Sequence, residues 1–209
     1  MPAGLHARIV IRERLLSNDA TIDIHSQNFL MKKSIGTRIL ISILASCFSC
    51  CALADTEADV IKSMSYNPKI KLLHKLAAFD GLLLGFDGGE WGGALIFLDK
   101  QGRATKVYDS NVKGIVTAGH QILVFSGLAH MGGNEGKIVE LNQVANDPPS
   151  ARELVTLEGE PSAVRQVDEQ AVAFQVFTGF DRDGKMTYAC KSFVNGFVSN
   201  LIGCATADN

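Results

Sequence analysis

The 209-residue chain has 46% hydrophobic residues, 20% charged residues and a formal net charge of −2, which describes a globular protein with one unusually apolar segment. From Asp55 onward, 14 Lys and Arg face 19 Asp and Glu, a net charge of −5. Phosphate backbones bind basic clusters, so this acidic balance excludes nucleic acid as an expected partner.

Residues 31–54 predict a cleavable secretory signal. The segment begins with Met31 and three basic residues, continues with the apolar run Ile39–Ala45, and ends in Ala52-Leu53-Ala54 before Asp55, the small-x-small pattern of a signal peptidase site. Its apolar part is shorter than the roughly 20 residues of a membrane-spanning helix. We therefore expect cleavage after Ala54 and a periplasmic or secreted protein.

Two features leave alternatives open. Residues 1–30 precede Met31, and we interpret them as a mis-assigned start, with a targeting extension as the alternative. The tetrapeptide Leu44-Ala45-Ser46-Cys47 resembles the lipobox of bacterial lipoproteins. Processing there would lipidate Cys47 and tether the protein to a membrane, so a membrane contact is expected only in that case.

The segment Asp55–Asn67 predicts a short amphipathic helix. Val60, Ile61 and Met64 recur at helical spacing, and Pro68 ends the pattern. A single β-rich domain is expected to follow this helix and to extend to Asn209.

From about Lys71 to Gly203, short apolar runs alternate with Gly, Asp and Asn, which is typical of an all-β protein. Twelve runs form three groups at a spacing of 40–50 residues, which predicts about three blade-like repeats of a four-strand antiparallel meander. Propellers have about four to eight blades, so the alternatives include an open β array, a sandwich or barrel, and half of a dimeric ring. The expected strands are Leu73–Phe79, Leu82–Phe86, Ala94–Leu98 and Thr105–Tyr108, then Lys113–Ala118, Ile122–Phe125, Lys137–Leu141 and Glu153–Leu157, then Ala163–Val167, Val172–Val176, Met186–Cys190 and Phe197–Ile202.

Two cysteines remain after the predicted cleavage site, Cys190 and Cys204. Two cysteines in an exported domain usually pair, so a disulfide is expected. A two-residue turn at Asn195-Gly196 would place Cys190 opposite Leu201. Cys204 then lies beyond the strand end, and the disulfide would act as a C-terminal clasp.

Three polar, Gly-rich loops are expected at the same position in the three repeats, at residues 87–93, 130–136 and 181–184. The first holds the only tryptophan between two carboxylates, an arrangement suited to recognition. The second pairs a histidine with a glutamate, which favours acid/base or metal chemistry only weakly. The third is a fragment far shorter than a calcium loop. If the repeats are equivalent, the three segments gather on one edge, and the candidate binding residues are Asp87, Glu90, Trp91, His130, Asn134, Glu135, Asp181 and Asp183.

These features favour an exported, non-enzymatic binding protein over an enzyme. No nucleophile elbow, phosphate-binding glycine loop or zinc motif is present, so no catalytic residue, metal or cofactor is expected. The expected partner is a protein of the cell envelope, such as an enzyme that this chain inhibits. The alternatives are a glycan-binding module that uses Trp91, and a hydrolase of envelope polymers that uses Asp87, Glu90, His130 and Glu135.

Overall fold

The computed structural model describes residues 55–145 and 147–201. All of them fall within the unit Cys51–Asn209. The predicted signal at 31–54, Cys47 and Cys204 lie outside the described residues, so export, lipidation and the disulfide stay predictions. No helix of the described part is long and apolar enough to cross a membrane.

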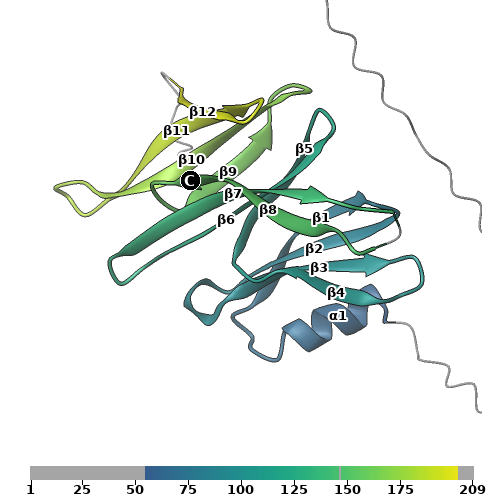
Figure 1. Ribbon diagram of the computed structural model, residues 1–209. Coiled ribbons are helices and arrows are strands. Elements are labelled where there is room, and N and C mark those ends of the chain that lie inside the picture. Colours follow the sequence, from purple (N-terminus) through teal and green to yellow (C-terminus); the bar gives the residue numbers. More distant parts are fainter. Residues whose placement is uncertain (1–54, 146, 202–209) are drawn as a thin grey trace, which may run out of the picture. The chain divides into compact units, whose positions relative to one another are not determined.

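The described residues form one helix and three antiparallel sheets (Figure 1). The helix is α1 (Glu57–Met64). Sheet 1 contains β1 (Lys71–Ala78), β2 (Gly81–Asp87), β3 (Gly93–Asp99) and β4 (Ala104–Tyr108). Sheet 2 contains β5 (Val112–Ala118), β6 (Gln121–His130), β7 (Gly133–Asn142) and β8 (Ser150–Leu157). Sheet 3 contains β9 (Pro161–Gln166), β10 (Ala171–Phe180), β11 (Met186–Val194) and β12 (Phe197–Asn200).

Each sheet is a meander in which every strand pairs with the next along the chain. The predicted all-β fold with three four-strand repeats is therefore confirmed. The first strands of neighbouring sheets contact each other, β1 with β5 and β5 with β9. Within the described part of the chain the three sheets form an open array and not a closed propeller.

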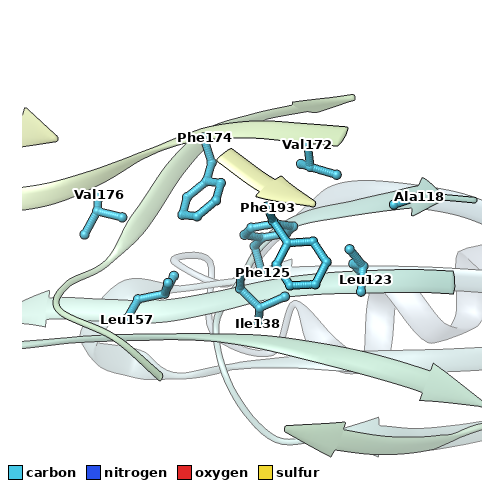
Figure 2. Packing of buried hydrophobic residues seen from close by; sticks show 9 residues of the cluster. All are labelled: Ala118, Leu123, Phe125, Ile138, Leu157, Val172, Phe174, Val176 and Phe193. Carbon is cyan, nitrogen blue, oxygen red and sulfur yellow. The ribbon is translucent and has the colours of Figure 1, made fainter. Parts of the chain in front are cut away.

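The hydrophobic core lies between the sheets. One cluster joins sheet 1 to sheet 2 through residues such as Leu83 and Val124, and another joins sheet 2 to sheet 3 through Phe125 and Phe174. The rings of Phe125 and Phe174 lie 4.9 Å apart between their centroids, and Figure 2 shows them meeting beside Phe193. Neighbouring residues on β6 thus enter opposite clusters, because side chains alternate across a strand.

Helix α1 covers the other face of sheet 1. Val60 packs with Leu84 and Phe86 in a third cluster, and Thr56 begins the helix with a capping box that involves Asp59. The helix thus buries apolar side chains of sheet 1 that do not belong to the cluster shared with sheet 2.

The turn between β11 and β12 agrees with its predicted geometry. Asn195 and Gly196 have φ values of 49° and 88°, as a two-residue hairpin turn with two left-handed residues requires. The N–H of Leu201 donates to the carbonyl of Cys190 at 2.9 Å. The expected register between these two residues is therefore present.

The close packing of β5 against β9 depends on Gly114. A Cβ placed there would lie 2.7 Å from the Cβ of Val164. Gly114→Ala is therefore expected to lower the free energy of unfolding by about 1–3 kcal/mol through overpacking, measured by urea denaturation. Val164→Gly removes the obstructing Cβ together with its methyl groups, so the double variant should lose less than the sum of the two single variants. Strict additivity would contradict this account.

Candidate functional site

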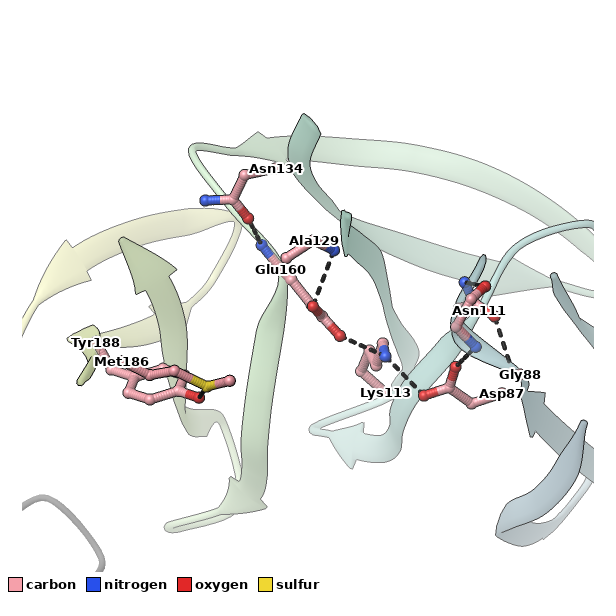
Figure 3. A network of polar contacts seen from close by, with 10 residues as sticks. Asp87, Gly88, Asn111, Lys113, Ala129, Asn134, Glu160, Met186 and Tyr188 are labelled. Carbon is pink, nitrogen blue, oxygen red and sulfur yellow. Dashed lines mark hydrogen bonds and ion pairs between the residues drawn. The ribbon is translucent and has the colours of Figure 1, made fainter. Parts of the chain in front are cut away.

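A chain of polar contacts crosses all three sheets at one edge (Figure 3). Its centre is Lys113 on β5, whose ammonium group pairs with Asp87 at the end of β2 at 2.6 Å and with Glu160 just before β9. The three side chains are 13–22% exposed. One ammonium group therefore ties sheet 1 and sheet 3 to sheet 2.

Glu160 extends this contact chain toward sheet 3. Its Oε2 accepts a hydrogen bond from the backbone N–H of Ala129 at 2.9 Å. Its own N–H donates to Oδ1 of Asn134 at 2.8 Å, and Nδ2 of Asn134 donates to the carbonyl of Phe177 at 2.8 Å. These bonds join the ends of β6 and β7 to β10.

Asn111 forms hydrogen bonds with the backbone at the end of sheet 1. Its side chain is buried, accepts from the N–H of Gly88 at 3.2 Å and donates to the carbonyl of Gly89 at 2.8 Å. Gly88 precedes the 3₁₀ turn η1 (Gly89–Trp91), and Gly89 begins it. The turn that carries Glu90 and Trp91 is thus held by the linker between sheets 1 and 2.

The charges within this contact chain influence one another. Burial by itself would lower the pKa of Lys113, but hydrogen bonds and charge interactions with Asp87 and Glu160 outweigh burial and raise it. The pKa of His74, which is half-buried nearby, is lowered by burial, although the charge of Asp87 opposes this. His74 is therefore neutral near pH 7, while Lys113 carries its full charge.

The predicted polar loop of the second repeat is not a loop. Its residues continue β6 and β7 as a hairpin that ends in a two-residue turn at Met131–Gly132. A Cβ at Gly127 would lie 2.7 Å from Cδ of Pro161, so glycine lets this hairpin lie close against the segment that enters sheet 3. We name its tip, residues 129–134, the Met131 arm. The end of the β10–β11 hairpin, residues 177–188, is the Phe180 arm.

The structure brings some of the predicted site residues together. Nε2 of His130 lies 2.9 Å from a carboxylate oxygen of Glu90, which joins the 3₁₀ turn to the Met131 arm. Asp87 and Asn134 belong to the polar contact chain described above. Trp91 is 49% exposed, and Nζ of Lys69 lies 5.3 Å from its ring centroid.

Other predicted site residues have local roles or lie apart. Oδ1 of Asp181 accepts from the N–H groups of Asp183 and Lys185 at 2.9 Å each, so it shapes its own turn. Asp183 is exposed in that turn, and Glu135 is exposed on β7 opposite Leu128. Within the described residues, no group of three or more His, Cys, Asp or Glu is arranged to hold a metal ion.

A groove of about 680 Å³ lies between the Met131 arm and the Phe180 arm. Phe177 contributes an aromatic wall, with its ring centroid 5.4 Å from that of Phe180 and 5.8 Å from that of Tyr188. Met131 and Met186 also line the groove and are 93% and 61% exposed. Sequence reasoning missed this wall, because Phe177 and Tyr188 follow the alternation of ordinary strand residues.

Sequence reasoning also missed Lys113, Glu160 and Asn111. Nothing in their immediate sequence distinguishes them from surface residues next to strands. Their role arises from partners 22 to 47 positions away.

Comparison with protein-family models, with curated proteins and with solved structures finds no match to this chain. The residues of this edge and their geometry therefore carry the functional argument alone.

Proposed function

We propose that this chain is an exported, non-enzymatic binding protein that holds a protein partner of the cell envelope at the two arms and the groove between them. The partner would be an envelope enzyme that the chain inhibits or neutralises. The signal-like segment 31–54 supports export. The observation that carries the proposal is the side chain of Met131, which is 93% exposed at the tip of its arm.

Met131 occupies a position that favours other residues. Its φ of 46° is left-handed, a conformation that two-residue turns usually fill with Asn, Asp or Gly. In the β11–β12 turn, the equivalent position holds Asn195, with a φ of 49°. A large apolar side chain there is unfavourable both for the turn and for its exposure to water, which supports a role in contact with a partner.

Exposed apolar side chains on the neighbouring arm extend this surface. Phe180 is 64% exposed and Met186 is 61% exposed, and both line the groove together with Met131. Large exposed apolar side chains that a partner can bury together usually form the centre of a protein interface, with polar groups at its rim.

Met131→Asn tests the proposal without endangering the fold. Asparagine suits the left-handed turn position, so the thermal midpoint of unfolding should stay the same or rise. Affinity for the partner should fall about tenfold or more, as expected for the loss of one apolar anchor. The immobilised wild-type protein should retain a stoichiometric protein from envelope extract, and titration calorimetry with that protein then measures the affinity.

Phe197→Asn is the matched control. Phe197 is 79% exposed, follows the β11–β12 turn and does not line the groove. This variant should bind the retained protein as tightly as wild type does. Unchanged affinity of Met131→Asn would contradict the proposal.

A glycan is the second candidate partner, favoured by one observation. Trp91 borders a hollow of about 570 Å³ together with Lys69 and Lys71, and an exposed indole ring can stack on a sugar. Retention of the chain on peptidoglycan beads, lost in Trp91→Ala and kept in Met131→Asn, would establish this candidate in place of the first.

A further inference from the structure

The groove between the arms contains a carboxylate and aromatic rings but no lysine or arginine. Glu160 lines it together with Phe177, Phe180 and Tyr188. His130 also lines it and is paired with Glu90. The electrostatic character of the groove is therefore set by Glu160.

The carboxylate of Glu160 is not fully neutralised. Lys113 supplies one positive charge to two carboxylates, those of Asp87 and Glu160. On the Asp87 side, Lys69 and Lys71 line the hollow beside Trp91 and add positive charge. Asp87 and Glu160 together carry one more negative charge than Lys113 supplies, and of these two carboxylates Glu160 is the one that lines the groove.

We infer that the groove receives a cationic side chain of the bound partner, arginine in preference to lysine. This inference rests on the proposed function and names the chemistry that the partner must present. A guanidinium group pairs with a carboxylate and also stacks on aromatic rings, which a lysine ammonium does less well. The net charge of −5 from Asp55 onward favours a basic partner as well.

Three blocked dipeptides test the inference on the full-length chain as expressed and processed. Acetyl-Phe-Arg-amide is compared with acetyl-Phe-Lys-amide and with acetyl-Phe-citrulline-amide, which keeps the shape of arginine without its charge. Amide chemical shifts are followed in ¹⁵N-labelled protein. The arginine probe should move the signals of Ala129 and Gly179, and its dissociation constant should be at least tenfold lower than that of the citrulline probe.

Glu160→Gln is the test variant and Glu158→Gln is its matched control. Glu158 lies two positions away, is 53% exposed, pairs with Lys191 and does not line the groove. Glu160→Gln leaves Lys113 paired with Asp87, and its amide oxygen can still accept from Ala129. The arginine probe should bind Glu160→Gln about tenfold more weakly than wild type and Glu158→Gln as tightly as wild type.

Equal binding of the arginine and citrulline probes to wild type would overturn the inference, and this comparison needs no variant. Equal loss in Glu160→Gln and Glu158→Gln would overturn it as well. Neither result changes the expected effect of Met131→Asn on the affinity for the partner. If Met131→Asn reduces partner binding while Glu160→Gln leaves the arginine probe unaffected, the proposed function stands and only the cationic specificity fails.

Discussion

Replacing Lys113 with methionine is expected to lower the free energy of unfolding by about 3 kcal/mol, because two partly buried carboxylates lose their shared counter-charge. Asp87 and Glu160 would remain 13% and 22% exposed, with no cation between them. Methionine keeps the length and apolar stem of lysine, so the loss reports the charge and not the packing. Urea denaturation at pH 7, monitored by circular dichroism, measures the change.

The triple variant Lys113→Met, Asp87→Asn, Glu160→Gln provides the control. Without the carboxylates the missing ammonium group costs little, so most of the lost stability should return. A triple variant as unstable as Lys113→Met alone would show that the charges do not explain the effect.

The pKa of Lys113 is raised in the folded state. The stability that the Lys113 charge contributes is thus present below the unfolded pKa near 10.4 and is lost as the pH rises through the raised value. The free energies of unfolding of wild type and of Lys113→Met should therefore converge at strongly alkaline pH.

Phe125→Ala is expected to cost about 4 kcal/mol, since it opens a cavity where sheets 2 and 3 meet. The ring is fully buried and packs at a tilt against the ring of Phe174, and the surrounding strands cannot collapse into the space without losing their register. The same urea denaturation measures the loss.

Phe197→Ala is the matched control for this second experiment. The ring of Phe197 is 79% exposed, so its removal should change stability by no more than about 0.5 kcal/mol. Similar losses in Phe125→Ala and Phe197→Ala would show that the packing of sheet 3 on sheet 2 does not hold the fold together.

These two residues also bear on the site. Phe125 fixes sheet 3 on sheet 2, and Lys113 joins the sheets at the edge where the arms lie. The groove exists only because sheets 2 and 3 meet there. Partner binding should therefore depend on residues that the partner never contacts.

Much of the fold was predictable from local sequence. Short apolar runs bounded by Gly, Asp and Asn identify strands, and the spacing of these runs revealed the three meanders. Helix α1 follows from apolar spacing and from Thr56 at its start. The β11–β12 turn follows from Asn195–Gly196. Each of these features depends on neighbours a few positions apart, which is why the sequence by itself determined them.

The site depended on contacts that no local pattern contains. Residues 129–134 resemble a loop in composition, yet they continue the pairing of β6 with β7 as a hairpin, and Gly127 allows this hairpin to lie close to Pro161. Lys113 resembles a surface lysine until the fold brings Asp87 and Glu160 to it. Only the tertiary structure decided these roles, because electrostatic and steric partners distant in sequence meet only when the sheets pack.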